Sequence, residues 1–600
     1  MPRATAPKTL YGTPLPATRS GVLYSAFSYP TKISPESIAV FIAAHTKPGD
    51  TLLDTFGGSG TTGLAAHLCS NPTSEVIELA KKLGVAAKWG PRNAIVYELS
   101  VLGSFVGRTM CAPPDPVEFT KAVNELIEQC ADDLKMVYAA TDDQGNEGTL
   151  RHAIWSDVLV CNSCEAEVSF WDGAVSTEPL AIASAVTCPA CGQRSDLDQT
   201  QRAYETFHDS LIGQKAIRRK RVLKRIYGQT KGRKWSRPAT SADEAIASAV
   251  AGMPLPSCVP VVKIAWGDLH RSGYHKGITH AHHFYTPRNL LAVATIWERI
   301  ENAPSEMRDA LRLLALSYNA SHATLMTRVV MKSGEKDFVL TGAQSGVLYI
   351  SNLPVEKNVL EGLRRKAKTI AAAFAIIRES KSNVEVVCGD SRNLDLPDKS
   401  IDYVFTDPPF GDYIPYAEIN FLNEVWLGKT TEKANEIIIS QSQKKSVSHY
   451  RSCMEEVFTE IARTLKDTGK ATVVFHSAKA DVWSALQDAY RNSGFHVVTS
   501  GVLDKEQGSF KQVTSRDAVK GDPLLLLSKK RSKTILSSNL QADEVIAELL
   551  AHAAKAKDHK ERTPERLFSR FVTRYLENGL TVPMDADCFY QKARPLLGTQ

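Results

Sequence analysis

The sequence predicts an α/β protein whose parallel sheet is split by a long insertion. Strands are expected at residues 51–54 and 94–98 near the N-terminus, and at 384–387 and 401–406 far along the chain. The first strand runs directly into a glycine-rich turn and a helix, and the others end at or near an acidic residue. Because open α/β sheets bind ligands at the carboxyl ends of their strands, these segments are expected to form one split site.

Length and composition set the broad class. A chain of 600 residues exceeds one compact core, so two or more structural units are expected. Hydrophobic residues make up 43% and charged residues 23%, as is ordinary for a globular protein. No long apolar run and no apolar N-terminal segment occur, so we expect a cytoplasmic, nucleoid-associated protein without a membrane partner. The net charge of +6 weakly indicates an anionic partner.

The first strand leads into a loop suited to ligand binding. Ser34 can cap a helix that has Pro35 at its first position, and residues 48–50 then turn the chain into the strand. Phe56-Gly57-Gly58-Ser59-Gly60 and a helix follow. Glycines at this junction let a ligand approach the N–H groups of the helix N-terminus. The absence of Gly-Lys-Ser/Thr excludes a Walker phosphate loop.

The second strand ends at Glu98. An acid at this point is the usual partner of ribose hydroxyls in doubly wound sheets, and we interpret Glu98 as such a ligand. The alternative is an ordinary solvated acid.

The strand at 401–406 ends in Asp407-Pro408-Pro409-Phe410, a tetrapeptide suited to methylation of an exocyclic amino group. Such a nitrogen is a poor nucleophile because its lone pair is delocalised into the ring, so a catalyst has to accept hydrogen bonds from the NH2 group. The Asp407 carboxylate and the Pro408 carbonyl can accept them, and Phe410 offers a face for stacking a base that has left the helix. The alternative is a strand that ends in a proline-rich turn.

These motifs resemble the DNA amino-methyltransferases that act on adenine N6 or cytosine N4, whose hallmark is [DNS]PP[YFW]. YPTK-x2-P and PGD-x-LLD-x-FGGSGTTG resemble their motifs X and I, and the aromatic stretch after residue 410 resembles large adenine-specific DNA methylases with a zinc ribbon. The resemblance covers about 29–100 and 355–529. It implies a Rossmann-like class I methyltransferase sheet and S-adenosylmethionine as cofactor. It assigns catalysis to Asp407, Pro408, Pro409 and Phe410, and cofactor binding to Lys32, Pro35, Asp54, Phe56, Gly58, Gly60, Glu98 and Asp390.

The resemblance favours methylation of adenine N6 in double-stranded DNA with base flipping. Cytosine N4 and RNA remain open as acceptors, as does the setting, whether alone, beside a restriction nuclease or with phage-defence subunits. Tyr413 and Tyr416 are further candidates for holding a base. The non-enzymatic alternative is a zinc-ribbon nucleic-acid-binding protein with a degenerate methyltransferase domain.

Four of the eleven cysteines form two CxxC pairs, Cys161/Cys164 and Cys188/Cys191. This spacing is typical of a four-cysteine zinc ribbon, and a closed thiolate shell predicts a structural Zn2+. The alternative is four unligated thiols. His280, His282 and His283 are expected to be surface or phosphate-facing groups, so no metal is predicted there.

A basic segment at 213–238 follows the cysteines. Eleven residues between 215 and 237 are Lys or Arg and none is acidic, and Tyr227 and Trp235 are interleaved with them. We expect a basic helix that binds phosphates without sequence preference, against the alternative of a solvated face. The nucleic-acid-binding candidates are Arg218, Arg219, Lys220, Arg221, Lys224, Arg225, Lys231, Arg233 and Lys234.

The expected organisation has five parts. An irregular arm (1–28) precedes the first methyltransferase part (29–110). An insertion for target recognition (111–354) holds the zinc ribbon (155–200), the basic segment and a returning strand at 344–354. The second methyltransferase part (355–530) opens with a helix at 355–378 and closes with a hairpin of 495–502 and 523–527. A small helical extension (531–600) begins with a linker at 531–562 and ends with a helix capped by Thr563.

Overall fold

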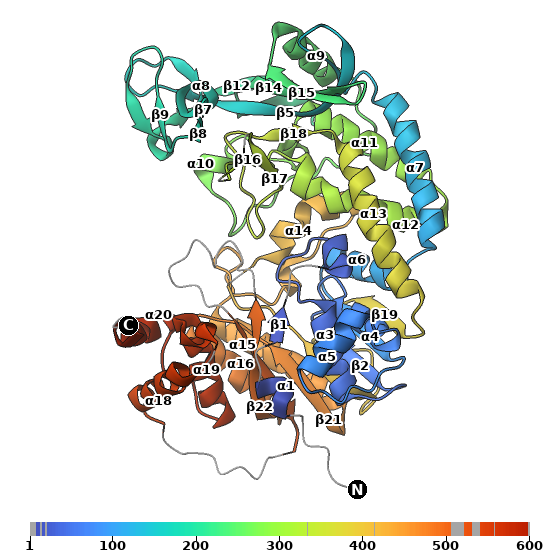
Figure 1. Cartoon of the computed structure of the whole chain (residues 1–600), viewed down its shortest axis with the longest axis vertical. Coiled ribbons are helices and arrows are strands. Elements are labelled where there is room, and N and C mark those ends of the chain that lie inside the picture. Colours follow the sequence, from blue (N-terminus) through green and yellow to red (C-terminus); the bar gives the residue numbers. More distant parts are fainter. Residues whose placement is uncertain are drawn as a thin grey trace. The chain divides into compact units, whose positions relative to one another are not determined.

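The computed structural model describes residues 8–12, 15–17, 21–332, 334–335, 337–412, 414–505, 521–530, 540–556 and 558–597. The chain forms two compact units (Figure 1). The first comprises Met1–Asp115, Ala372–Asn420 and Thr430–Gln600, and the second comprises Pro116–Ala371 and Phe421–Lys429. The second unit therefore takes up the long middle of the chain and also a short piece, Phe421–Lys429, that the sequence analysis placed in the methyltransferase part.

The first unit is built on an eight-stranded mixed sheet with the order β1-β22-β23-β21-β20-β2-β3-β19. Its neighbours are parallel except at β23, which is antiparallel to both β21 and β22. The predicted α/β class and closing hairpin are confirmed. The strands are β1 Leu15–Ala17, β2 Thr51–Asp54, β3 Asn93–Glu98, β19 Asn383–Cys388, β20 Ile401–Thr406, β21 Leu465–Val474, β22 His496–Lys505 and β23 Asp522–Ser528.

Alternate side chains of β20 enter two different helix layers. Tyr403 and Phe405 contact α3 (Pro35–His45), with ring centroids 5.1 Å from His45 and 5.7 Å from Phe41. Val404 joins a core cluster with α15 (Val447–Thr464) and α16 (Ala480–Asn492). The central strands are therefore buried on both faces, as their nearly continuous apolar sequences require.

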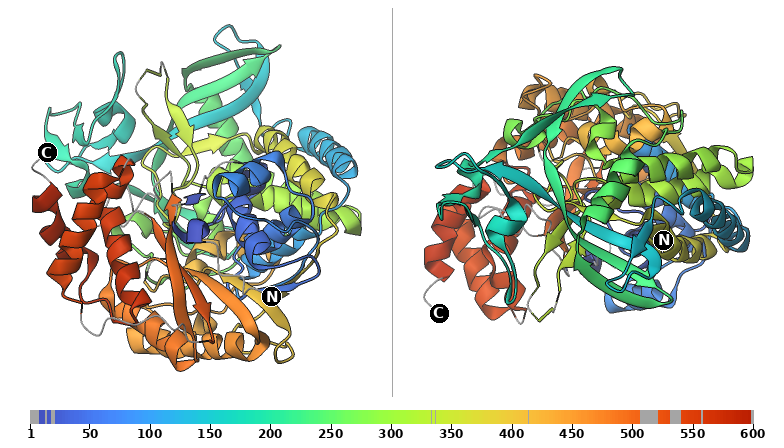
Figure 2. Two further views of the ribbon diagram at one scale, coloured as in Figure 1. Left: turned by 60° about the horizontal axis from the view of Figure 1, so that its bottom comes forward. Right: turned by 90° about the horizontal axis from the view of Figure 1, so that it is seen from above.

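Two terminal segments differ from expectation. The arm, expected to be irregular, pairs its strand β1 in parallel with β22 and buries Leu10 and Tyr11. The expected linker contains a helix, α18, and the helix capped by Thr563, α19, is followed by α20 (Figure 2). The remaining helices of this unit are α1 Lys8–Gly12, α2 Val22–Ala26, α4 Thr61–Ser70, α5 Ser74–Lys82, α6 Val101–Cys111, η5 Lys433–Asn435, α18 Ala542–Lys555, η6 His559–Arg562, α19 Pro564–Glu577 and α20 Ala586–Leu597.

The second unit contains a seven-stranded sheet around its longest strand, β5 (Glu147–Val160). The path β11-β5-β14-β15 forms its spine, and β4, β6 and β18 also pair with β5. Its strands are β4 Ala139–Thr141, β6 Glu167–Ser169, β11 Gln201–Arg202, β14 Arg221–Thr230, β15 Arg233–Pro238 and β18 Val355–Lys357. Short pairs outside it are β7 Val175–Thr177 with β8 Leu180–Ile182, β9 Ala185–Thr187 with β10 Arg194–Asp196, β12 Tyr204–Asp209 with β13 Gln214–Arg219, and β16 Arg328–Val330 with β17 Val339–Thr341.

The expected basic helix is wrong, because the segment forms strands β13, β14 and β15. Lys231 and Gly232, with φ of 46° and 84°, make the two-residue turn between β14 and β15. Positive φ at both positions matches the twist of a hairpin, and Gly232 adopts it without strain. Leu223 and Ile226 of β14 are buried, and an irregularity in the pairing of β14 with β5 lies between them.

Helices complete the second unit. The expected strand at 344–354 does not form, and the chain is irregular there until β18. None of the helices within the described ranges is both long and apolar enough to cross a membrane. The helices are α7 Pro116–Asp133, α8 Phe170–Ala174, η1 Leu197–Gln199, α9 Ser241–Ala251, α10 Ser272–His275, η2 Ala281–Phe284, α11 Pro287–Glu301, α12 Ser305–Tyr318, η3 Asn319–Ala323 and η4 Val425–Leu427, while α13 Val359–Arg378 and α14 Tyr416–Glu424 each have residues in both units.

Candidate active site

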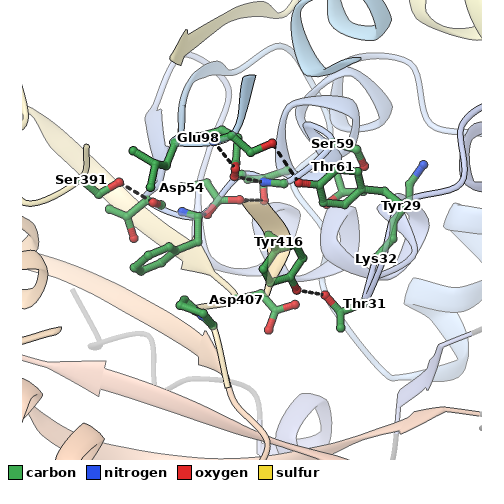
Figure 3. A pocket seen from close by; sticks show the side chains of 18 of the residues that line it. Tyr29, Thr31, Lys32, Asp54, Ser59, Thr61, Glu98, Ser391, Asp407 and Tyr416 are labelled. Atoms are coloured by element: carbon green, nitrogen blue, oxygen red, sulfur yellow. Dashed lines mark hydrogen bonds between the residues drawn. The ribbon is translucent and has the colours of Figure 1, made fainter. Parts of the chain in front are cut away.

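A pocket in the first unit lies where the sheet changes direction. From β2 the chain proceeds to β3 and β19 on one side, then returns to β20 and β21 on the other, so β2 and β20 are neighbours at the reversal. This is the place at which doubly wound sheets bind ligands. The pocket is lined by residues 29–33, Ile38, 54–59, 61–62, 98–100, 390–391, Phe405, Asp407, Pro409, Tyr416, Thr431 and 435–437 (Figure 3).

Asp54, at the end of β2, accepts three hydrogen bonds from neighbouring segments. One carboxylate oxygen accepts hydrogen bonds from the Phe56 N–H and the Thr406 hydroxyl, both at 3.0 Å, and the other accepts from the Thr62 hydroxyl at 2.6 Å. Burial raises the pKa of Asp54 to about 6, although these hydrogen bonds act in the opposite direction. Asp54 lines the pocket as predicted, and its bonds hold the ends of β2 and β20 together.

The glycines of the loop have different roles. Gly58, with φ of 53°, donates its N–H to Glu98 Oε2 at 2.7 Å and lines the pocket. Gly60 does not line it. A Cβ on Gly60 would lie 2.7 Å from the Cα of Gly107 in α6, and its φ is 81°. Gly60 therefore allows a close approach of two backbones, and its role in cofactor binding stays a prediction.

Glu98 and Ser59 present polar groups to the pocket. Glu98 receives the N–H of Ser100 at 2.8 Å in addition to that of Gly58, which orients its carboxylate at the tip of β3. Ser59 Oγ is buried and makes no hydrogen bond with any residue in the described ranges. A buried hydroxyl without a partner is costly, so this atom suits a ligand that supplies one.

Three predicted cofactor ligands have other contacts in this structure. They are Lys32, Pro35 and Asp390. Lys32 lines the pocket, but its Nζ donates to the carbonyls of Leu23 and Tyr24 at 3.0 and 3.2 Å. Pro35 begins α3 and is buried outside the lining. Asp390 lines the pocket and accepts hydrogen bonds from the Arg392 guanidinium.

Asp407 and Pro409 line the pocket, whereas Pro408 and Phe410 do not. Tyr450, from α15, donates its hydroxyl to the Pro409 carbonyl at 2.7 Å and so fixes the loop after β20. Phe410 is 8% exposed and packs edge-on against Phe475 at 5.6 Å. In this structure the ring packs in the core, and the stacking of a base on Phe410 stays a prediction.

Tyr416 is the aromatic ring beside Asp407 (Figure 3). Its hydroxyl is 2.6 Å from Thr31 Oγ1, and its ring stacks on Tyr29 at 6.1 Å with an interplanar angle of 15°. Tyr413 lies outside the described residues.

Glu436 is a lining residue that the sequence analysis missed. It accepts hydrogen bonds from the Ala417 N–H at 3.1 Å and from the Gln443 side chain at 3.0 Å. The local sequence is an irregular polar stretch with no motif, so no signal pointed to it.

One family comparison bears on this pocket. Residues 9–73 match the model of a family described as a DNA methylase (N6_N4_Mtase), and this stretch carries the loop from Asp54 to Thr62. The match supports the resemblance to amino-methyltransferases, without specifying the base. A search of curated proteins found no match.

Solved structures similar to parts of this chain include the following three. The antibiotic-resistance methyltransferase Kmr is 14% identical over 29% of this chain and 73% of its own, with a TM-score of 0.16. The PH0226 protein of Pyrococcus horikoshii OT3 is 16% identical over 28% and 68%, with a TM-score of 0.15. Geranyl diphosphate C-methyltransferase of Streptomyces coelicolor A3(2) is 10% identical over 49% and 100%, with a TM-score of 0.16. TM-scores this low carry no argument about this chain.

The four paired cysteines converge in the second unit. The Sγ atoms of Cys161 and Cys191 are 3.6 Å apart, those of Cys164 and Cys188 are 3.8 Å apart, and all four lie within 4.8 Å. A tetrahedral Zn2+ with Zn–S bonds of about 2.3 Å places its sulfurs about 3.8 Å apart, so the cluster fits this ion. Hydrogen bonds from the N–H groups of Cys164 and Ser163 lower the pKa of the Cys161 thiol to about 6, which favours the thiolate that binds a metal.

Most of the basic segment is paired with acids of its own unit. Asp157 is fully buried and forms ion pairs with both Arg219 and Arg221. These two pairs account for the position of both arginines beside the sheet. Arg225 donates to Ser236 and lies over the Tyr227 ring. Lys231 and Lys234 are exposed and have no ion pair with any described residue. The other pairs are Arg218 with Glu205 at 2.6 Å, Lys220 with Glu167, Lys224 with Asp172 at 2.7 Å and Arg233 with Asp142 at 3.0 Å.

Proposed function

We propose that this chain is an S-adenosylmethionine-dependent DNA methyltransferase that modifies an exocyclic amino group, with adenine N6 as the favoured acceptor. The observation that carries the proposal is the single pocket that joins the loop after β2, the tip of β3 and Asp407 after β20. These loops meet at the reversal of the sheet although they are far apart in sequence. Thr55 and Thr406, for example, share a hydrogen bond and are 351 residues apart. The family match over residues 9–73 supports the same reaction class.

The pocket residues fit the cofactor. Ser59 Oγ offers a buried hydroxyl, and Glu98 offers a carboxylate at the strand tip for ribose hydroxyls. Lys32, Asp54, Phe56, Gly58 and Asp390 also line the pocket. When bound, S-adenosylmethionine supplies an electrophilic methyl group on a sulfonium.

The acceptor side is formed by Asp407 and Tyr416. The Asp407 carboxylate, which lines the pocket, accepts hydrogen bonds from the amino group, and this leaves the lone pair available for the methyl group. The Pro408 carbonyl, which is outside the lining, remains the second acceptor that the resemblance implies. Tyr416, which lines the pocket where Phe410 does not, takes the place of the stacking ring. The pocket residues would align the amino group with the methyl group that S-adenosylmethionine supplies and would exclude water, and these two effects would account for much of the rate enhancement.

Cytosine N4 in DNA and amino groups in RNA are the second candidates, since the same carboxylate and carbonyl could accept their hydrogen bonds. The structural Zn2+ proposed at the four cysteines is compatible with all of them. The non-enzymatic alternative predicts a pocket without affinity for S-adenosylmethionine.

Two measurements separate these alternatives. Calorimetric titration of the full chain with S-adenosylmethionine should show one site per chain, and the absence of binding would support the non-enzymatic alternative. Nucleoside mass spectrometry of double-stranded DNA and of RNA, each incubated with protein and cofactor, should then show N6-methyladenine in DNA. N4-methylcytosine, or methylation of RNA only, would replace the favoured acceptor while keeping the reaction class.

A further inference from the structure

A second set of metal-ligating side chains lies in the second unit, distinct from the four cysteines. Asp209 ends β12, and His282 and His283 lie in η2, 73 and 74 residues away. The Nε2 atoms of both imidazoles are 2.8 Å from the same atom, Asp209 Oδ2. One ligand atom from each residue lies within 4.8 Å of the others. Three donor atoms from two separate segments thus converge on one point.

The three side chains are buried, against the expectation of surface histidines. Asp209 and His282 are each 5% exposed and His283 is 6% exposed. A carboxylate at this depth has to be compensated by hydrogen-bond donors or a cation. Two imidazoles and a carboxylate are a donor set that Zn2+ and similar first-row divalent ions accept.

The spacing leaves room for an ion after a small movement. Donor atoms about 2.1 Å from a tetrahedral ion are about 3.4 Å apart, so each 2.8 Å separation has to open by about 0.6 Å. His283 Nδ1 accepts the Thr279 N–H at 3.2 Å, so Nε2 carries the proton that is donated to Asp209, and an ion can bind Nε2 only after that proton has left. The ring of His280 is 5.5 Å from the rings of both other histidines, and His280 is not part of the group of converging ligand atoms.

Four arginines line the same cavity as the cluster, and each is paired with an acid. Arg218 pairs with Glu205, Arg288 pairs with Glu356, and Arg219 and Arg221 share Asp157. The cavity also gives the cluster a route for an entering ion.

We propose that Asp209, His282 and His283 bind a first-row divalent metal ion such as Zn2+. The ion fastens the end of β12 to the segment that leads into α11. It would hold the β12–β13 hairpin against the helical part of the second unit, and the role is structural. This proposal is independent of the reaction at the methyltransferase pocket.

Metal content of the full chain tests the proposal. After loading with Zn2+ and dialysis, elemental analysis should find two equivalents in the wild type. The double variant Cys164→Ser/Cys191→Ser should retain one, and Asp209→Asn/His283→Gln should lose the other. His208→Gln is the matched control, because His208 is exposed and adjacent to Asp209. Circular dichroism shows whether each variant is folded. Unchanged metal content in folded Asp209→Asn/His283→Gln contradicts the proposal.

Cobalt spectroscopy of the wild-type chain gives a second test that needs no variant. A site of nitrogen and oxygen ligands gives visible d–d bands without the thiolate-to-cobalt charge-transfer band of a cysteine site. One equivalent of Co2+ should bind with the charge-transfer band and one without it. If every bound Co2+ shows the charge-transfer band, Asp209, His282 and His283 form a hydrogen-bonded cluster without an ion, and the proposal is wrong.

Discussion

The Tyr416 hydroxyl lies 2.6 Å from Thr31 Oγ1, although 385 residues separate the two in sequence. This hydrogen bond joins the segment before α3 to the first turn of α14 within the wall of the pocket. Burial raises the pKa of Tyr416 well above its ordinary value, so the hydroxyl stays protonated and able to donate. The bond holds the Tyr416 ring beside Asp407.

Two replacements of Tyr416 distinguish the contribution of its hydroxyl from that of its ring. Tyr416→Phe removes one hydrogen bond, worth about 1 kcal/mol, and should lower kcat/KM for the nucleic acid by about tenfold or less. Tyr416→Ala also removes the stacking surface and should lower it by more than about a hundredfold. The Kd for S-adenosylmethionine should change little in both. Equal activity of Tyr416→Ala and wild type would remove this ring from the acceptor site.

Gly60→Ala should destabilise the fold for a steric reason. The added Cβ would meet the Gly107 backbone at 2.7 Å, in addition to the cost of φ at 81°. Gly494→Ala is the matched control, because Gly494 has φ of 85° with no atom within 4 Å of its Cβ position. Urea unfolding should show Gly60→Ala to be less stable than Gly494→Ala by about 1 to 3 kcal/mol. Equal losses would mean that backbone strain alone accounts for Gly60.

Asp54 should make stability depend on pH in the acid range. Its pKa is raised from 3.8 to about 6 in the folded chain, so the folded state binds the proton more tightly than the unfolded state. The free energy of unfolding should therefore fall by about 3 kcal/mol through this group as pH rises from about 4 to about 6. Asp54→Asn cannot titrate, and its urea midpoints over this range should lack that fall. A variant that keeps the wild-type pH profile would contradict the assignment.

Basic residues of this segment that are exposed should differ in their effects from those that form buried ion pairs. Lys234→Glu changes an exposed charge and should weaken binding to DNA and reduce its salt dependence, with little effect on the unfolding midpoint. Arg219→Glu places a second negative charge beside buried Asp157 and should destabilise the second unit by about 3 to 5 kcal/mol. Fluorescence anisotropy over a salt series and thermal unfolding report the two effects. If Lys234→Glu leaves the salt slope unchanged, this hairpin lies outside the nucleic-acid interface.

The strands of the first unit were predictable because each is a short apolar run that ends in a turn or an acid. The position of Asp54, Glu98 and Asp407 in one pocket follows from parallel strands having their carboxyl ends at one edge. The position of the Phe410 ring was not predictable in this way, because it packs against Phe475, which follows the neighbouring strand β21 and is 65 residues away in sequence.

The second unit was less accessible to sequence reasoning. The basic segment has charges at successive positions, which hides the alternation of a strand, and its acidic partners such as Asp157 and Glu205 lie elsewhere in the sequence. The turn at Lys231-Gly232 was the local signal for a hairpin. The convergence of His282 and His283 on Asp209 depends on a contact between segments 73 residues apart.

Single-turnover methyl transfer by Asp407→Ala tests the central claim most directly. Asp412→Ala is the control, because Asp412 is exposed and paired with Lys479 at 2.8 Å. With radiolabelled S-adenosylmethionine and double-stranded DNA, Asp407→Ala should lose at least about a thousandfold in rate while its cofactor Kd stays within about threefold of wild type. Asp412→Ala should behave as wild type. Near-normal turnover by Asp407→Ala, with product of the same mass on the same base, would contradict the account.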